Sequence, residues 1–213
     1  MPTNETFKLR PLGKNVYLRV SKGHFATGHS HTNYYIDVTT QKTRLSEAQA
    51  VAGELMTSYR SSTVIDTILC LDGTEVIGTC LAEALTAADF ISINAHQTIY
   101  VLTPEHTTGS QLIFRDNTAP MIAGKHVLVL AASVTTGYTA ASAIEAVRYY
   151  GGEVVGVSAI FATVDRCGGI PVTSVFNPTD LPDYASFPAG ECPLCRGGQR
   201  LQALINSYGF SKL

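Results

Sequence analysis

The sequence predicts an α/β protein with a mostly parallel central sheet flanked by helices. Two continuous apolar stretches, His126–Ala132 and Glu153–Phe161, are typical of buried strands, and the amphipathic stretch Thr139–Tyr150 joins them. A third stretch, Val64–Cys70, is short and β-branched, and helical periodicity follows it. Apolar strands joined through a helix imply a parallel, right-handed crossover with both sheet faces covered.

The first half of the chain predicts alternating helices and strands. Ser46 to Gln49 has the spacing of a capping box, and apolar residues recur at helical intervals after it, so we expect a helix over about 46–59. A turn over 72–75 separates the strand Val64–Cys70 from a helix over Val76–Ala88. Two short strands are expected at Ile91–Asn94 and Thr98–Leu102.

The remaining segments are less regular. Thr103–Gly124 is mostly polar and is expected to be a mobile loop around a short strand at Gln111–Phe114. Gly151 and Gly152 end the helix that precedes the second apolar strand. After Phe161 the periodicity is lost, several prolines follow, and a short helix is expected near Leu201–Ser207.

Composition bounds the functional classes. The chain has 213 residues, 45% of them hydrophobic, which is ordinary for one globular domain. Charged residues make up 15% and the net charge is −2, so no basic field favours nucleic acid or an anionic membrane as a partner. Basic residues interrupt the first 20 positions and no later run approaches ~18 apolar residues, so we expect a soluble, cytoplasmic protein.

The turn between the apolar strand and its helix has the character of a phosphate cradle. Successive backbone N–H groups and a helix N-terminus point at one place there, and hydroxyls add donors. Gly137 lets the backbone approach an anion closely. The candidate phosphate-binding residues are Ser133, Thr135, Thr136, Gly137, Tyr138 and Thr139. The alternative is an ordinary βα turn with Thr139 as N-cap.

Commoner phosphate-binding motifs are missing from the sequence. It contains no Gly-x-Gly-x-x-Gly and no Gly-x-x-x-x-Gly-Lys-Ser/Thr motif. A nucleoside-triphosphate or dinucleotide enzyme is therefore disfavoured.

Three segments together resemble the type I phosphoribosyltransferases, and the orotate phosphoribosyltransferases among them most. Val127-Leu-Val-Leu-Ala-Ala-Ser-Val-Thr-Thr-Gly-Tyr-Thr139 resembles the family's signature of an apolar strand, two acids and a Thr-Thr-Gly turn. The segment from Gly23 to Asp37 resembles the part of that branch that helps form a hood over the base. Glu191–Gly198 resembles a tail found in some members. The resemblance covers the chain from about 20 to 200.

The resemblance implies a fold, a ligand and a reaction. It implies a single type I phosphoribosyltransferase domain over 1–213, with a small hood from about 1–40 and 165–213 and a core over about 41–164. In that family the turn binds the 5′-phosphate of phosphoribosyl pyrophosphate, Mg²⁺ helps to hold the pyrophosphate, and a nitrogenous base displaces it. It also implies a homodimer.

The sequence departs from the family where chemistry is done. Ala131 and Ala132 stand where the family has acids that hold the ribose hydroxyls and stabilise the cationic transition state. Each lost charge-assisted hydrogen bond is worth ~1.5–3 kcal/mol, so two lost bonds lower turnover by roughly 10²–10⁴ unless something compensates. The segment Tyr100–Gly109, which matches the family's mobile loop, has no Lys or Arg to neutralise the leaving pyrophosphate.

The first βα turn also departs from the family pattern. Asp72, Gly73, Thr74 and Glu75 are the candidates for a pyrophosphate loop or a metal site. Acids beside a polyanion repel it unless a metal intervenes, so Asp72 and Glu75 are either Mg²⁺ ligands or solvated loop carboxylates.

Other candidate sites lie toward the chain ends. Tyr34 and Tyr35 either stack on a planar base or belong to a strand core. Cys192 and Cys195 have the spacing of half a zinc site, whose second pair would come from Cys167 and a histidine or from another subunit; the alternative is unliganded thiols. His24, His29 and His31 lie close in sequence but lack a ligand pattern in register, so they are a weak metal signal.

Two functional hypotheses follow. In the first, the protein binds phosphoribosyl pyrophosphate or a nucleotide 5′-phosphate and transfers ribose 5-phosphate to a pyrimidine-type base. In the second, it is a catalytically silent sensor that kept the phosphate grip. A zinc-clamped interaction module is a third reading, based on Cys192 and Cys195.

Overall fold

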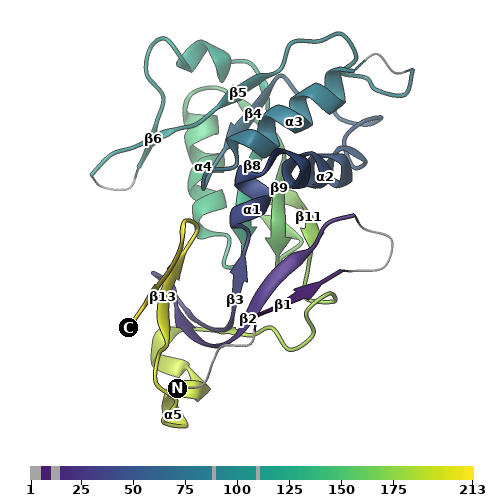
Figure 1. The fold of residues 1–213 in the computed structure, drawn as a ribbon. Coiled ribbons are helices and arrows are strands. Elements are labelled where there is room, and N and C mark those ends of the chain that lie inside the picture. Colours follow the sequence, from purple (N-terminus) through teal and green to yellow (C-terminus); the bar gives the residue numbers. More distant parts are fainter. Residues whose placement is uncertain (1–5, 11–14, 88–89, 109–110) are drawn as a thin grey trace. The chain divides into compact units, whose positions relative to one another are not determined.

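The computed structural model describes residues 6–10, 15–87, 90–108 and 111–213 (Figure 1). The chain forms two compact units. The central unit is Gln41–Val175, and the terminal unit combines Met1–Thr40 with Phe176–Leu213. Whether they act as one domain, as the resemblance implies, stays a prediction.

The central unit contains a six-stranded sheet in the order β10-β11-β9-β8-β4-β5. Its strands are β4 (Thr67–Cys70), β5 (Tyr100–Leu102), β8 (His126–Val134), β9 (Glu153–Ala162), β10 (Arg166–Cys167) and β11 (Ile170–Phe176). The neighbouring strands among β5, β4, β8 and β9 pair in parallel, whereas β10 and β11 pair with each other in antiparallel. The predicted parallel arrangement is therefore confirmed.

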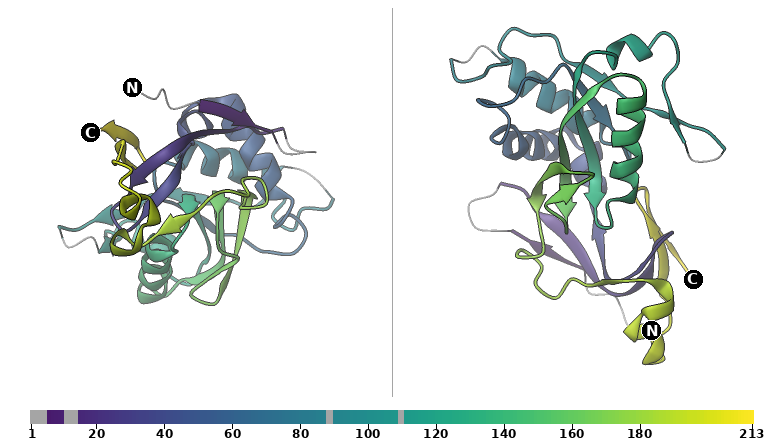
Figure 2. Two further views of the ribbon diagram at one scale, coloured as in Figure 1. Left: turned by 90° about the horizontal axis from the view of Figure 1, so that it is seen from below. Right: turned by 180° about the vertical axis from the view of Figure 1, so that it is seen from behind.

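Helices cover both faces of this sheet (Figures 1 and 2). α2 (Leu45–Met56) and α3 (Glu75–Thr86) lie together on one face, and α4 (Tyr138–Tyr149) lies on the other. The short helix α1 (Thr39–Thr43) precedes α2, and a 3₁₀ turn spans Ala119–Met121. Val127 and Val129 of β8 pack in one buried cluster with Ile144 of α4. Because strand side chains alternate, Leu128 points to the opposite face, where α2 and α3 lie together. Continuous burial on both faces explains the uninterrupted apolar run.

Side-chain hydrogen bonds shift several predicted boundaries. The strand expected at Ile91–Asn94 is wrong: Ser92 donates to the Leu85 carbonyl, and Asn94 bonds to Ile65 N–H and the Thr63 carbonyl, which holds a turn. Because Ile65 N–H donates to the Asn94 side chain, the strand predicted to begin at Val64 begins at Thr67 in the structure.

The capping box is wrong as well. Ser46 lies inside α2, because the helix begins one residue earlier, at Leu45. Its N-cap is Arg44, whose backbone carbonyl accepts from Glu47 and Ala48 N–H and whose side chain makes no cap bond. The helix predicted to end at Ala88 ends at Thr86 in the structure, and Ala88 lies outside the described residues.

The segment Thr103–Gly124 contains more structure than expected. β7 (Leu112–Ile113) confirms the predicted short strand, and it pairs with β6 (Glu105–His106), which the sequence did not indicate. Arg115 and Glu105 form an ion pair at 2.7 Å across this hairpin. Its expected mobility stays a prediction, and Gly109 lies outside the described residues.

The terminal unit is mainly β-structure in the order β12-β3-β2-β13-β14, with β1 paired to β2. Its elements are β1 (Thr6–Leu9), β2 (Leu18–Ala26), β3 (His31–Asp37), β12 (Ser186–Phe187), a 3₁₀ turn (Ala189–Glu191), α5 (Pro193–Arg196), β13 (Ala203–Asn206) and β14 (Gly209–Lys212). The helix predicted at Leu201–Ser207 is wrong, because this segment is β13, which pairs with β2 and β14.

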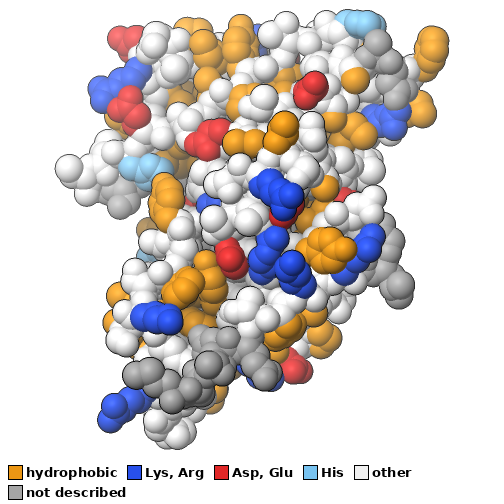
Figure 3. All heavy atoms as spheres, viewed as in Figure 1, with side chains coloured by type: hydrophobic (Ala, Val, Ile, Leu, Met, Phe, Trp, Pro, Cys, Tyr) orange, Lys and Arg blue, Asp and Glu red, His pale blue; other side chains and the backbone are white. Residues whose placement is uncertain are grey.

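The surface carries both signs of charge. On the face drawn in Figure 3, Lys and Arg side chains stand among Asp and Glu, and no single-sign field covers it. Among the described residues no helix is both long enough and apolar enough to cross a membrane.

Two helical glycines provide a test of the packing. An added Cβ at Gly78 in α3 would clash with Cys70 Sγ and would lie 3.3 Å from Val101 Cγ1, whereas one at Gly53 in α2 would meet nothing within 4 Å. We expect Gly78→Ala to lower the free energy of unfolding by about 1–3 kcal/mol. Gly53→Ala should raise it by about 0.5–1 kcal/mol. Denaturant melts of both variants measure this, and equal effects would contradict the packing described here.

Candidate functional site

Two βα turns leave the same edge of the central sheet side by side. β4 and β8 are parallel neighbours whose last register pair joins Cys70 to Leu130. The carbonyl of Leu130 accepts hydrogen bonds from Leu71 N–H at 2.8 Å and from Thr74 Oγ1 at 3.0 Å. The turn after β4 is thus fixed to β8. In open α/β sheets, ligands bind outside these carboxyl ends of the strands.

The turn after β8 presents backbone N–H groups and hydroxyls at a helix N-terminus. Gly137 is the N-cap of α4 in the left-handed conformation, with φ 76°. Thr139 lies inside the helix, so the expectation of Thr139 as N-cap is wrong. Ala141 N–H donates to the Gly137 carbonyl at 2.8 Å, and N–H groups of the helix before this first bond have no acceptor within it.

Most side chains of this turn are exposed to solvent, while hydrogen bonds to its backbone carbonyls hold it in place. Ser133, Thr136, Tyr138 and Thr139 are exposed, and Thr135 and Gly137 are half-buried. Beneath the turn, Thr163 Oγ1 donates to the Thr135 carbonyl at 2.7 Å, and Cys167 Sγ donates to the Gly137 carbonyl at 3.3 Å. An anion can therefore reach a turn whose backbone is already held in place.

The two alanines that precede the turn lie within the sheet. Ala131 and Ala132 are each 1% exposed, and Ala131 pairs with Ala159 of β9. Neither methyl group can accept a hydrogen bond from a ribose hydroxyl or balance a positive charge.

A cation from another element lies beside the turn after β4, and the sequence pattern did not indicate it. Asp72 and Gly73 have left-handed φ values of 59° and 76°. Lys42 of α1 is largely buried, and its Nζ donates to the Asp72 carbonyl at 2.7 Å. A Cβ at Gly73 would lie 3.7 Å from Lys42 Nζ and 4.0 Å from Glu75 Oε2. The Lys42 ammonium group and the Glu75 carboxylate therefore lie near Gly73, which follows Asp72 in the chain, and only the tertiary fold brings Lys42 there.

The cysteines near the two turns are neutral thiols. Burial, with the nearby charge of Glu75, raises the pKa of Cys70 to about 12. Burial also raises the pKa of Cys167. Neither thiol is thus activated as a nucleophile.

The tyrosines proposed for base stacking lie in β3 of the terminal unit. Tyr34 and Tyr35 are both buried, and Tyr35 packs against Phe25 and Phe210. Burial, with the charge of Asp37, raises the pKa of Tyr35 to about 12. These contacts favour the strand-core alternative, and base stacking by either ring stays a prediction.

The neighbours of the cysteine pair are two of the three histidines that form only a weak metal signal in the sequence. Cys192 and Cys195 lie beside His24 and His31, and the four potential ligand atoms are all within 4.8 Å of one another. The expectation that Cys167 would complete the pair is wrong, because Cys167 bonds to Gly137 in the central unit. Pairing of β2 with β3 brings the two histidines together, which their spacing in the sequence does not reveal.

Comparison with known proteins gives consistent similarities. No protein-family model matches the chain. A curated orotate phosphoribosyltransferase of Chlorobaculum parvum is 26% identical over 183 residues, which span 85% of this chain and 86% of the relative. A second, of Caldicellulosiruptor bescii, is 40% identical over 76 residues, 35% of this chain and 38% of the relative.

A solved structure shows the same fold. The crystal structure of orotate phosphoribosyltransferase from Aeropyrum pernix superimposes with a TM-score of 0.55 at 18% identity, covering 76% of this chain and 90% of that one. At this identity the likeness concerns the fold alone.

Proposed function

We propose that this chain, which has the type I phosphoribosyltransferase fold, is an orotate phosphoribosyltransferase-like protein that binds ribose 5-phosphate compounds at the turn from Ser133 to Thr139. The observation that carries the proposal is the pair of neighbouring turns at the carboxyl edge of β4 and β8. The second turn would hold the 5′-phosphate, because its helix N-terminus and hydroxyls favour a negative charge.

The substrate would be phosphoribosyl pyrophosphate, and the acceptor a pyrimidine-type base. An orotate phosphoribosyltransferase of Mycobacterium tuberculosis, solved in complex with phosphoribosyl pyrophosphate, has a similar fold with a TM-score of 0.50 at 20% identity. In this chain the 5′-phosphate would lie on the turn after β8, which leaves the pyrophosphate to the turn after β4. A homodimer stays a prediction from the resemblance.

Magnesium belongs to the proposal because the donor set fits it. Mg²⁺ is usually held by one or two carboxylates together with substrate phosphates, and the turn after β4 offers Asp72 and Glu75. When bound, the ion would neutralise charge on the pyrophosphate. Lys42, which donates to the carbonyl of Asp72, would add a fixed positive charge beside the same turn.

A second candidate function, a silent sensor of nucleotides, rests on the buried Ala131 and Ala132. Binding through the phosphate needs neither position, whereas transfer needs stabilisation of a cationic ribose. A protein with this turn and without acids can therefore keep its ligand and lose most of its turnover.

The phosphate grip is tested by Gly137→Val. Gly137 has φ 76°, and a Cβ there would lie 3.2 Å from Cys167 Sγ, so the turn must distort. We expect binding of inorganic phosphate and of a nucleoside monophosphate, measured by calorimetry, to weaken by at least about tenfold, or 1.4 kcal/mol.

Gly151→Val is the matched control, because Gly151 follows the other end of α4 with φ 80° and open space around it. It should cost stability and leave phosphate binding unchanged. No phosphate binding by the unmodified protein at millimolar concentration would refute the grip.

Turnover is the second test. We expect conversion of orotate to its nucleotide to be at least ~10²-fold slower than an ordinary turnover of about 1–10³ per second, because no carboxylate stands at the end of β8. Replacing Ala131 and Ala132 by acids should raise the rate. Full-speed turnover by the unmodified protein would contradict this expectation, and alanine substitution of Asp72 and Glu75 would then identify the compensating groups.

The order of affinities is the third test. Two carboxylates and one ammonium leave the turn after β4 with one net negative charge, so it should repel a pyrophosphate. Without a divalent cation we expect a nucleoside monophosphate to bind at least as well as phosphoribosyl pyrophosphate, and Mg²⁺ to favour the latter. Lys42→Met should weaken only the pyrophosphate ligand. Calorimetry on both ligands checks this, and tighter binding of phosphoribosyl pyrophosphate in a chelator would overturn it.

A further inference from the structure

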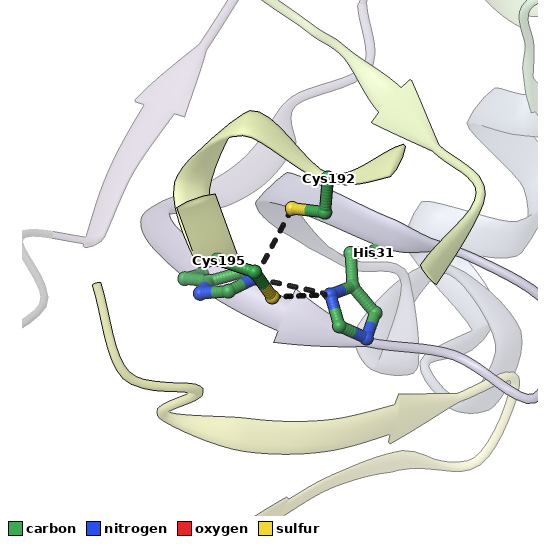
Figure 4. Close-up of side chains that lie close together, drawn as sticks. His31, Cys192 and Cys195 are labelled. Atoms are coloured by element: carbon green, nitrogen blue, oxygen red, sulfur yellow. Dashed lines mark hydrogen bonds between the residues drawn. The ribbon is translucent and has the colours of Figure 1, made fainter. Parts of the chain in front are cut away.

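Two histidines and two cysteines of the terminal unit converge on one point. His24 Nε2 lies 3.2 Å from His31 Nδ1, 3.5 Å from Cys192 Sγ and 3.7 Å from Cys195 Sγ. Cys195 Sγ lies 3.3 Å from His31 Nδ1. Figure 4 shows Cys192, Cys195 and His31 pointing toward one another. The cluster is the single group of three or more potential metal ligands within the described part of the chain.

These four distances match edges of a tetrahedron around a metal ion, which has six edges in all. Zinc binds imidazole nitrogen at about 2.0–2.1 Å and thiolate sulfur at about 2.3 Å, so tetrahedral ligands stand about 3.3 Å apart for two nitrogens and about 3.6 Å for nitrogen and sulfur. The nitrogen pair here is at 3.2 Å, and the nitrogen–sulfur pairs are at 3.3–3.7 Å. The other two pairs both involve Cys192 and lie within 4.8 Å, so an ion at the centre would require at most a small inward shift of the Cys192 thiol.

The backbone of two distant segments holds the ligands in place. His24 and His31 lie at the facing ends of β2 and β3, beside a register shift between Lys22 and Phe25 that marks a bulge. Cys192 is the N-cap of α5, and Cys195 lies within that short helix. After α5 the chain returns to β2, where Gln202 N–H donates to the His24 carbonyl at 2.9 Å and Ala203 pairs with Phe25.

The ring of His24 is oriented by a hydrogen bond outside the cluster. His24 is fully buried, and its Nδ1 lies 2.8 Å from the carbonyl of Gln199. A carbonyl accepts only, so Nδ1 donates to it, and in this tautomer of the neutral ring Nε2 directs its lone pair at the other three groups. Metal-bound histidines usually have this kind of partner on the second nitrogen.

We propose that His24, His31, Cys192 and Cys195 bind one Zn²⁺ ion in a closed structural site. Two nitrogen and two sulfur ligands in a tetrahedron favour zinc, and four protein ligands leave no open position for catalysis. The ion would fasten the segment around α5 to the β2–β3 hairpin. This site is independent of the phosphate turn, since its ligands all belong to the terminal unit.

Metal content is the first measurement. Full-length protein, purified without chelators or a metal-affinity tag, should contain about one zinc per chain by elemental analysis. Cys195→Ser removes an exposed ligand and should reduce the zinc content to near zero while the protein stays folded. His29→Gln is the matched control, because His29 lies on the same hairpin but outside the cluster, and it should retain the full zinc content.

Cobalt gives a readout of the ligands themselves. After zinc is exchanged for Co²⁺, the protein should show the visible bands of tetrahedral cobalt and a thiolate-to-cobalt charge-transfer band. That band should fall by about half in any Cys195→Ser protein that still takes up cobalt, because one of two sulfur ligands is lost.

Two results would overturn the proposal. One is less than a tenth of an equivalent of zinc in the unmodified protein, with no cobalt spectrum after reconstitution; the four groups would then be thiols and imidazoles joined by hydrogen bonds alone. The other is equal zinc content in Cys195→Ser and the unmodified protein, which would place the ion elsewhere. If Cys195→Ser does not fold, a strong chelator added to the unmodified protein decides, because zinc removal should lower its melting temperature.

Discussion

The parallel pairing of β4 with β8 is the constraint on which the central unit depends. It aligns Cys70 with Leu130, so the two strands end together and their turns begin together. The Leu130 carbonyl then accepts hydrogen bonds from both Leu71 N–H and the Thr74 hydroxyl. Because its hydroxyl has this partner, Thr74 can be fully buried in a polar turn. A one-residue change of register would move one turn away from the other and would exchange the buried faces of β8.

This arrangement separates ligand binding from catalysis in physical terms. In the proposed function, the turn after β8 would attract an anion through its N–H groups and the dipole of α4, and both are properties of the backbone that side-chain changes at Ala131 and Ala132 leave intact. Stabilising a developing positive charge needs carboxylates placed on the ribose side. A chain can therefore lose the second capacity without losing the first. The charges around Gly73, from Lys42 and two acids, would then determine the affinity for a ligand that also carries a pyrophosphate.

Much of the central unit could be predicted from the sequence because its signals are local and repeated. The apolar runs of β8 and β9 and the periodicity of α4 lie in single continuous stretches, and their boundaries agree with the structure to within one or two residues. Lys42 could not be assigned to the site, because only the fold brings it to a turn 30 residues away. The segment at Ile91–Asn94 was misleading for the opposite reason. Its apolar alternation suggests a strand, but the buried polar side chains of Ser92 and Asn94 bond to backbone groups and form a turn.

The terminal unit depends on contacts that no local pattern encodes. Its two segments are separated by the whole central unit, and the bonds from Cys192 and Cys195 to His24 span 168 and 171 residues. A cross-link stabilises a fold by lowering the entropy of the unfolded chain, and this effect increases with the length of the loop that it closes. A strong link between segments so far apart in the sequence would therefore give a large stabilisation. Hydrogen bonds between thiols and imidazoles are too weak to supply such a link, whereas a zinc ion binds its four ligands only when the segments are in place. Under the zinc proposal, the contacts at His24 would fix the C-terminal segment to the N-terminal hairpin. The bulge in β2, the carbonyl of Gln199 and the return of the chain to Phe25 all lie around one imidazole, which would face the proposed zinc ion between the last 38 residues and the first 40.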